Sequence, residues 1–525
     1  MTGPVAFHQE GNLISDYVTD FGEKLYSSCD QLSASSSDDD CTSHNTFRDK
    51  EGNSSCDLNK EDPISSDENF YLQEEVSYPK LCGLKVPRKY NIHDAADYGS
   101  IAEFAHQKTK DGSQKGSFLV CNLRQIVRQF YLWKKELPMV EPFYAIKCNP
   151  DPMIVRLLAH LGCGFDCATM GEIDIVINDL GDDLSFGRDP LAEKAANKIV
   201  YANPAKMESH LQFAADNNVR MTVFDGEDEL LKISKIRGNE NFRLLLRLTT
   251  DDSSSVCRFS TKFGCPVDES ESLLQLAKDL GLNVAGVSFH VGSGCGNPDA
   301  YTVALAHSRI VFDTAEKLGM PAMTVVDIGG GFPGDKSGVV GGVNMPDFPL
   351  LASAVRKGIS AFLADLDDEK ASKIRFIAEP GRFFVSASVS IITKVYSRKG
   401  GKKDYQALYV DDGVYGSFNN VVYDHAKPIV EKLSSYATQV QKKRLAVAYG
   451  LKCSAEESED TQIPSAVFGP TCDGLDQMCS LENTKLPRCE VGDWLMWEYQ
   501  GAYTHTASYV FNGYSHVPKT IFCFL

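Results

Sequence analysis

Residues 143–149 read FYAIKCN, a short apolar run that ends near a lysine, and similar runs return seven more times before residue 381. A polar turn and a stretch with helical periodicity follow each of them. Eight strand–helix units within about 245 residues predict a closed (β/α)8 barrel of the TIM type. An open, doubly wound sheet is the alternative, but no early GxGxxG run between a strand and a helix supports it. The runs are FYAIKCN (143–149), GFDCAT (164–169), KIVYANP (198–204), MTVFD (221–225), LLLRLTTDD (244–252), VAGVSFHVGS (284–293), MTVVDIGGG (323–331) and FIAEPG (376–381).

The sequence on either side of these runs differs in character. Residues 1–80 hold 17 Asp and Glu against 5 Lys and Arg, a net charge of −12 out of −18 for the 525 residues. A Ser- and Asp-rich segment of this kind buries too little apolar surface to fold, so residues 1–85 are predicted to be a disordered tail. Residues 123–388 are expected to form the barrel. Strand-like runs with little helix between them predict an all-β domain over 389–525, which the segment 86–122 joins.

Composition also excludes several classes of protein. No basic face is evident, so the chain is not expected to bind nucleic acid. The N-terminus does not have the pattern of a secretory signal, and no stretch of about 18 apolar residues predicts a membrane span. The 16 cysteines are scattered and lack paired zinc-ligand spacing. We therefore expect a cytoplasmic protein without a metal site.

Polar residues gather where the predicted strands end, which is where barrel enzymes place their functional groups. A lysine among apolar neighbours is costly to bury as an ammonium ion, so its pKa is expected to fall, which favours Schiff-base chemistry. A surface lysine in a loop is the alternative interpretation. The residues at these strand ends are Lys147, Asp166, Arg247, His290, Ser293, Gly329, Gly330, Gly331, Glu379 and Arg382.

The types of these residues indicate a cofactor. The Gly-rich run lets backbone N–H groups approach a phosphate closely, although three glycines can also form only a tight turn. Ser293 and Arg382 could add donors to the same phosphate. Glu379 could keep a pyridine nitrogen protonated, and the imidazole of His290 could stack on the ring. A lysine for an aldehyde, a phosphate cradle and an acid for a ring nitrogen together indicate pyridoxal phosphate.

The second domain contributes further candidates. Cys472 and Asp473 lie in FGPTCDGLD (468–476), where the thiol could donate a proton to a carbanion; a buried, inert cysteine is the alternative. Asp424 follows Tyr423, and two carboxylates facing one site could bind a distal ammonium group. Tyr503, in GAYT (501–504), offers a hydroxyl to a phosphate.

Several of these motifs resemble the eukaryotic ornithine decarboxylase family, over about residues 85–525. They include YAIKCNPDP, FDCATMGEI, SFHVGSG, DIGGGFPG, AEPGRFF, DDGVYGSFN, FGPTCDGLD and GAYT. The resemblance implies an alanine-racemase-like barrel, a C-terminal β domain and a head-to-tail homodimer with two shared active sites. It also implies the pyridoxal-phosphate-dependent conversion of L-ornithine to putrescine and carbon dioxide, the first step of polyamine biosynthesis.

The resemblance also implies a role for each candidate residue. Lys147 would hold the cofactor covalently, Glu379 would contact its ring nitrogen, and Cys472 would protonate the product carbanion. Asp424 and Tyr423, with Asp473 from the partner subunit, would bind the distal amine of the substrate. The remaining residues of the cofactor pocket would be Asp166, Arg247, His290, Ser293, Gly330, Gly331, Pro380, Gly381, Arg382 and Tyr503.

Two alternatives remain beside this function. A catalytically inactive paralogue, similar to the antizyme inhibitor, would bind a regulatory protein, but such proteins lose residues that are present here, such as Lys147 and Glu379. A decarboxylase of lysine, arginine or diaminopimelate is the other alternative. An antizyme-like regulator is a candidate partner, because the segment 210–231 resembles the part of animal forms that meets antizyme. That segment carries few basic residues.

Overall fold

The computed structural model describes residues 75–78, 81–87, 90–179, 196–334, 345–400, 404–448, 461–514 and 518–525. It divides into two units, residues 1–90 and residues 91–525. In the first unit, β1 (Glu75–Tyr78) and β2 (Leu84–Pro87) form an antiparallel two-stranded sheet. The tail predicted over 1–85 therefore contains regular structure at its end, and residues 1–74 lie outside the described residues. Most of the segment 182–198, which links β6 to β7, also lies outside them.

The second unit contains a closed barrel of eight parallel strands, in the order β5-β6-β7-β8-β9-β11-β13-β14, with β14 paired to β5. Each of the eight apolar runs in the sequence overlaps one of these strands, so the predicted barrel is confirmed. The strands are β5 (Val140–Ala145), β6 (Gly164–Cys167), β7 (Ile199–Tyr201), β8 (Met221–Phe224), β9 (Arg243–Leu248), β11 (Val284–Phe289), β13 (Val325–Asp327) and β14 (Arg375–Ala378).

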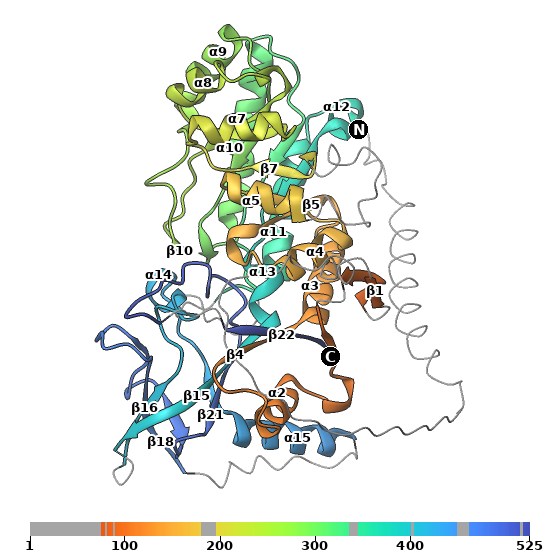
Figure 1. Ribbon diagram of the computed structural model, residues 1–525. Coiled ribbons are helices and arrows are strands. Elements are labelled where there is room, and N and C mark those ends of the chain that lie inside the picture. Colours follow the sequence, from red (N-terminus) through yellow and green to blue (C-terminus); the bar gives the residue numbers. More distant parts are fainter. Residues whose placement is uncertain are drawn as a thin grey trace, which may run out of the picture. The chain divides into compact units, whose positions relative to one another are not determined.

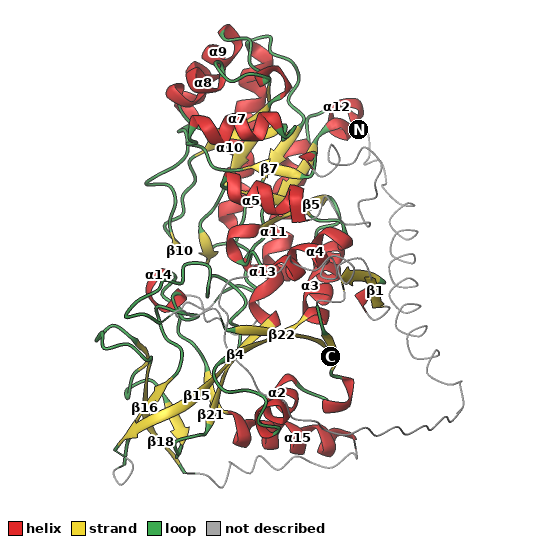
Figure 2. Cartoon of the chain, viewed as in Figure 1, coloured by secondary structure: helices red, strands yellow, loops and turns green. Residues whose placement is uncertain are grey.

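Helices connect successive strands of the barrel and cover its outside (Figure 2). Because each helix returns the chain to the same end of the barrel, all eight strands run in one direction. The connecting helices are α4 (Pro152–Leu161), α5 (Met170–Asp174) with a following π-helical turn (Ile175–Asp179), α7 (Glu208–Asp216), α8 (Glu227–Ile233), α9 (Ser270–Asp279), α10 (Asp299–Lys317), α11 (Phe348–Leu363) and α12 (Asp368–Lys373). In addition, α3 (Leu123–Glu136) precedes β5 and α13 (Arg382–Val385) follows β14.

The interior of the barrel is packed with side chains, and it is not a channel. Large and small apolar residues from different strands of the barrel form one buried cluster there, which includes Phe143, Val200 and Val223. The remaining members of this cluster are Ala202, Met221, Leu245, Val325 and Ile377. Since the middle of the barrel is filled, a small molecule has to bind at one end of it.

The C-terminal part of the chain forms a ten-stranded sheet (Figure 1). Its strands follow the order β19-β18-β16-β15-β4-β22-β3, while β21 pairs with β15 and β17, and β20 pairs with β18. The segment 86–122, expected to join this domain, contributes β3 and β4. The strands are β3 (Ile92–Asp94), β4 (Phe118–Asn122), β15 (Val389–Lys399), β16 (Gln406–Val410), β17 (Val430–Lys432), β18 (Gln462–Phe468), β19 (Gln477–Cys479), β20 (Lys485–Pro487), β21 (Trp494–Trp497) and β22 (Lys519–Phe524).

The prediction of an all-β domain over 389–525 needs a correction. The sheet carries the helices α14 (Asn420–Tyr423) and α15 (Leu433–Ala448), and α15 packs beside α2 (Ile101–Lys110). Leu433 and Ala437 of α15 are buried in a cluster with Phe104 and Phe118. The sequence of α15 is rich in Ala, Leu, Gln and Lys, which favour helices, and its weak apolar periodicity hid it among the strand-like runs.

Within the described residues, no helix is both long enough and apolar enough to span a bilayer.

Candidate active site

The end of β5 places Lys147 at the mouth of the barrel. Lys147 lies in a single 3-10 turn (Ile146–Cys148), and Asp151 ends the loop by capping α4 with a 2.9 Å hydrogen bond from the N–H of Met153. Pro152 begins the helix, where its missing N–H costs nothing. Ala145 pairs with Asp166 of β6, so the lysine two residues later reaches this carboxylate and forms an ion pair with it.

The surroundings of Lys147 correct one expectation. Burial acts to lower the pKa of the lysine, but the negative charges of Asp166 and Glu379 and the hydroxyl of Tyr503 outweigh it, so that the pKa is raised. The predicted fall of this pKa is therefore wrong for the chain as described, because a buried carboxylate faces the amine. The side chain of Lys147 is 39% exposed while that of Asp166 is fully buried, so the amine lies on the solvent side of a buried carboxylate.

Glu379 follows β14 and is close enough to Lys147 for its charge to act on the pKa of the lysine. Its carboxyl group is buried, and its Oε1 has no hydrogen-bond partner among the described residues. Burial and the nearby carboxylate of Asp327 raise the pKa of Glu379 well above its usual range. Arg247, near the end of β9, is also buried and counteracts this rise through its charge. A carboxyl group of this kind suits a ligand that brings a positive charge or an N–H donor.

The glycine-rich turn after β13 lies against this carboxyl group and against His290. A Cβ atom on Gly330 would come within 2.8 Å of both the carbonyl oxygen of Glu379 and Nε2 of His290. Gly331 has a φ of +101°, and a Cβ atom there would lie 2.7 Å from the carbonyl oxygen of Gly292. Only glycine allows both the backbone conformation and the close approach.

His290 follows β11 and is held as a neutral imidazole. Its Nδ1 accepts a 3.0 Å hydrogen bond from the N–H of Gly292, which leaves the proton on Nε2. Burial, together with the charges of Arg247 and Lys147, lowers the pKa of His290 well below its usual range. The ring of Phe259 contacts the imidazole edge-on at 5.0 Å between centroids. His290 thus offers a flat, uncharged face at physiological pH.

Arg382 begins α13 and contacts residues from both domains. Its Nη2 donates to Asp424 Oδ2 at 2.5 Å and to Ser293 Oγ at 3.3 Å, and its guanidinium lies 5.1 Å from the centre of the Tyr503 ring. Its Nε is buried without a hydrogen-bond partner among the described residues. The sequence predicts that Asp424 binds the distal amine of the substrate. The structure instead pairs it with Arg382, and its second oxygen accepts a 3.3 Å hydrogen bond from the thiol of Cys257.

Backbone contacts fix the position of Tyr503 relative to the lysine turn. The N–H of Tyr503 donates to the carbonyl oxygen of Cys148 at 2.9 Å, and the amide of Asn149 donates to Gly501 at 3.0 Å. On the barrel side, the N–H of Ala145 donates to Pro380 at 3.3 Å. A Cβ atom on Gly381 would lie 2.9 Å from the Cβ of Cys148. These contacts hold the EPGR and GAYT motifs against the turn that carries Lys147.

The structure does not bring Cys472 and Asp473 into this cluster. Cys472 is exposed, and Asp473 makes its hydrogen bonds within its own part of the sheet domain, from the hydroxyl of Tyr415 and from the N–H of Leu475. Those bonds lower the pKa of Asp473. Tyr423 is also turned outward, with 69% of its surface exposed. None of these observations ties the three residues to the buried centre.

Sequence reasoning missed three residues that the structure ties to these groups. Asp327 lies beside Glu379, Cys257 contacts Asp424, and Tyr415 contacts Asp473. Asp327 and Tyr415 lie within the motifs VVDIGGG and DDGVYG, so these motifs could have indicated both residues. Cys257 belongs to the short strand β10 (Ser255–Cys257), which pairs with β12 (Ser293–Cys295) and carries no recognisable motif.

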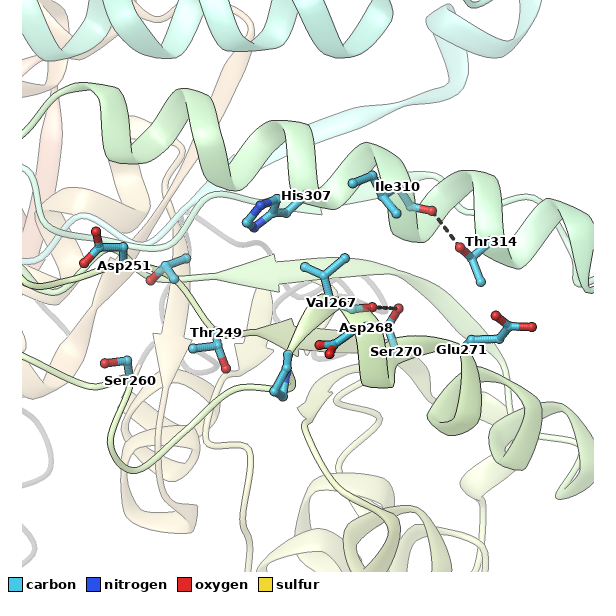
Figure 3. A pocket seen from close by; sticks show the side chains of 12 residues that line it. Thr249, Asp251, Ser260, Val267, Asp268, Ser270, Glu271, His307, Ile310 and Thr314 are labelled. Atoms are coloured by element: carbon cyan, nitrogen blue, oxygen red, sulfur yellow. Dashed lines mark hydrogen bonds between the residues drawn. The ribbon is translucent and has the colours of Figure 1, made fainter.

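A separate groove of about 810 Å³ lies between the loop after β9, the start of α9 and the helix α10 (Figure 3). His307 and Ile310 of α10 form one wall, while Thr249 and Val267 lie on the opposite wall. None of the predicted catalytic residues lines it. We therefore assign the chemistry to the cluster around Lys147 and not to this groove.

The buried cluster fits pyridoxal phosphate. Three buried polar atoms of this cluster have no hydrogen-bond partner among the described residues, and each could be used by this ligand: Oε1 of Glu379, Oδ1 of Asp166 and Nε of Arg382. A side chain at Gly330 or Gly331 would collide with its neighbours, and the lysine amine is close enough to act on the pKa values of both Glu379 and His290. The barrel and this set of donors define an enzyme that uses pyridoxal phosphate.

Comparison with known proteins identifies the family. Residues 123–386 match the model of the pyridoxal-binding domain of the pyridoxal-dependent decarboxylases. The chain is 39% identical to antizyme inhibitor 2 of Xenopus laevis (77% of this chain, 80% of that protein) and 38% identical to ornithine decarboxylase of Mus musculus (81% and 85%). A solved structure of the Paramecium bursaria Chlorella virus arginine decarboxylase bound to agmatine superposes with a TM-score of 0.67 at 28% identity, covering 81% of this chain and 100% of that one. The chain belongs to the ornithine decarboxylase family of pyridoxal-phosphate-dependent decarboxylases.

Proposed function

We propose that this chain converts L-ornithine to putrescine and carbon dioxide, the first step of polyamine biosynthesis. The observation that carries the proposal is the buried centre formed by Lys147, Asp166 and Glu379, with its unpartnered carboxylate oxygens. Ornithine decarboxylases at 38% identity over most of the chain support the substrate. We also propose that the protein acts in the cytoplasm.

Each residue of the cluster has a place around the cofactor. Lys147 would bond to its aldehyde carbon, Glu379 would contact its ring nitrogen, and His290 would lie against its face. When bound, pyridoxal phosphate supplies the electron sink that accepts the electron pair of the broken carbon–carbon bond. Its phosphate would be bound by Ser293, Gly330, Gly331, Arg382 and Tyr503, and the rest of the pocket would be Asp166, Arg247, Pro380 and Gly381.

The proposed reaction also needs a proton acceptor for the lysine amine and a proton donor for the product. Lys147 is paired with Asp166, and the amine has to give up a proton before it can bond to a carbonyl carbon. The carboxylate of Asp166 is positioned to accept it. After the carboxyl group has left, Cys472 would return a proton to the α-carbon of the product.

The distal amine of the substrate would be bound by carboxylates. Asp424 is buried and negatively charged, and an ammonium group two or three methylene groups from the reacting carbon could pair with it. Asp473 and Tyr423 would complete this site. Since Arg382 pairs with Asp424 in the structure, a phosphate and this carboxylate would compete for one guanidinium group.

We propose that Asp473 and Cys472 act in the site of a second subunit, in a homodimer with shared sites. Support comes from the exposure of Cys472, and from the hydrogen bond that holds Asp473 to Tyr415 of the sheet domain and not to the buried centre. Mixing inactive Lys147→Ala and Cys472→Ala chains should restore about a quarter of normal activity, because each mixed dimer has one intact site. No recovery despite demonstrated subunit exchange would contradict the shared site.

The substrate is tested by comparing kcat/KM for ornithine, lysine, arginine and diaminopimelate. The highest value is expected for ornithine, with lysine as a minor substrate. A preference for arginine would overturn the choice of substrate, since the longer guanidinium side chain needs a deeper acidic pocket. A preference for diaminopimelate would require a basic group where Asp473 stands.

A second candidate function is favoured by one observation, the 39% identity to antizyme inhibitor 2. In that case the chain would bind a regulatory protein, with 210–231 as the candidate contact segment, and would not catalyse a reaction. Cofactor uptake separates the two functions, because the lysine-bound cofactor absorbs at about 420 nm. A purified chain that never takes up pyridoxal phosphate and never releases carbon dioxide from ornithine would favour the second candidate.

A further inference from the structure

Asp327, the last residue of β13, is a fully buried carboxyl group to which the proposed reaction assigns no role. Its Oδ1 accepts a 2.9 Å hydrogen bond from the N–H of Gly329, and its Oδ2 accepts one of 3.3 Å from the hydroxyl of Ser288. An ionisable group inside a barrel core costs free energy unless its surroundings compensate it. Its position therefore requires a physical reason.

The nearest acidic neighbour of Asp327 is Glu379. The two strands run parallel, with Asp327 opposite Ile377, so that Glu379 comes two residues further along. The two side chains are near enough for each to act on the pKa of the other, and the N–H of Glu379 donates to the carbonyl oxygen of Gly329 at 2.7 Å. Burial raises the pKa of Asp327 to about 6, and burial together with the charge of Asp327 raises the pKa of Glu379 as well. Two buried carboxyl groups in direct contact do not both ionise near neutral pH.

The charges that face this pair come from three other elements. Asp166 of β6 adds a negative charge, while Arg247 of β9 and Lys147 of the turn after β5 add positive ones. His290 is neutral, as shown above. With every carboxyl group ionised, three negative charges face two positive ones, and one negative charge is left over. One proton, or one cationic group of a ligand, balances the centre.

We infer that Asp327 is a positioning residue that acts through Glu379: the two carboxyl groups hold one proton between them and present it to the ring nitrogen of the bound cofactor. This inference rests on the proposed function. Glu379 touches the ring nitrogen, and Asp327 does not. As the proton moves, the O–H bond of Glu379 breaks and an N–H bond to the ring forms, with no other reactant. Two carboxylates then stabilise the ring cation where one would otherwise do so.

The test uses the full chain loaded with pyridoxal phosphate labelled with nitrogen-15 in the ring. The nitrogen-15 chemical shift, followed from neutral to alkaline pH, reports whether the ring nitrogen is protonated. Asp327→Asn keeps the shape and an acceptor for Gly329 but removes the charge. We expect the ring nitrogen of this variant to lose its proton at least one pH unit lower than in the wild-type chain, a tenfold change in proton affinity. Superimposable titrations would overturn the inference.

Ser288→Ala is the matched control, because it removes a hydrogen bond to Asp327 and leaves the charge in place. Its titration should follow that of the wild-type chain. A shift as large as that of Asp327→Asn would assign the effect to packing and contradict the inference. If Asp327→Asn does not fold, infrared titration of the cofactor-free wild-type chain decides. The infrared spectrum of the wild-type chain should show a carboxyl group that stays protonated above the pH at which Asp and Glu side chains usually ionise, and this signal should be absent from Glu379→Gln. A wild-type chain without this signal would overturn the inference.

These outcomes are distinct from a failure of the proposed function. A wild-type chain that does not take up the cofactor or does not turn over ornithine would refute that function. An active wild-type chain whose ring nitrogen titrates as it does in Asp327→Asn would refute only the role of Asp327.

Discussion

Arg382 and Asp424 join the barrel to the sheet domain through a buried ion pair, with 2.5 Å between Nη2 and Oδ2. Their side chains are 10% and 9% exposed, so water compensates neither charge. Burial alone would lower the pKa of Arg382, but the charge of Asp424 outweighs it and raises the pKa. One residue is proposed to bind the phosphate and the other the substrate amine, so the two sites are electrostatically coupled.

Asp424→Ala should therefore destabilise the cofactor-free chain by about 3 kcal/mol, because it leaves a buried guanidinium without a counter-charge. Saturating pyridoxal phosphate should recover part of this loss, since a phosphate can replace the carboxylate. Urea unfolding with and without the cofactor measures both effects. The exposed Asp365→Ala is the control and should change neither value. An Asp424→Ala chain as stable as the wild-type chain would show that the pair does not hold the domains together.

Gly330→Ala should weaken the binding of pyridoxal phosphate roughly ten- to a hundredfold, because overpacking by one methyl group costs about 1–3 kcal/mol. The added Cβ would lie 2.8 Å from the backbone of Glu379 and from Nε2 of His290, so one of the two groups has to move. Fluorescence titration of the cofactor-free chain measures the affinity. Gly226→Ala, where nothing lies within 4 Å of the new atom, is the control. Unchanged affinity of Gly330→Ala would remove the glycine turn from the cofactor site.

The barrel could be predicted because every one of its strands is a short apolar run followed by a helix. A barrel brings the ends of its strands together, so a position at a strand end in the sequence indicates a place in the site. This relationship identified Lys147, Asp166, Glu379 and Arg382. The pairing of Asp424 with Arg382 could not be predicted, because it joins residues 42 positions apart in two different domains. The raised pKa of Lys147 was missed for a related reason. Its sign depends on how close Asp166 and Glu379 come, which the sequence does not contain. The helix α15 was missed because its apolar face is weak and its partner α2 lies more than 300 residues earlier.

A second buried lysine, in the loop after β7, gives a prediction about pH. Lys206 is completely buried and donates to the carbonyl oxygens of Val223 (2.6 Å) and Asn203 (3.0 Å), with Glu229 at 2.8 Å. Burial, only partly offset by Glu229, lowers its pKa to about 8. In the unfolded chain the pKa of a lysine is about 10.4, so between these values the unfolded chain binds more protons and the stability rises with pH.

Lys206→Met should remove this rise. From pH 8 to pH 10.5, the free energy of unfolding of the wild-type chain should rise by about 3 kcal/mol relative to that of the variant. Urea unfolding at the two pH values measures it, and Lys317→Met, at an exposed lysine, is the control that should show no such change. A difference that stays constant over this range would mean that Lys206 remains charged in the folded chain.

The central claim is that the amine of Lys147 forms the covalent bond to pyridoxal phosphate. Reduction of the loaded wild-type chain with borohydride fixes the cofactor to whichever amine holds it, and peptide mass spectrometry then locates it. We predict a single phosphopyridoxyl group, on Lys147, and none in Lys147→Ala. A modified lysine elsewhere, or a chain that retains the cofactor without any reducible bond to Lys147, would contradict the account.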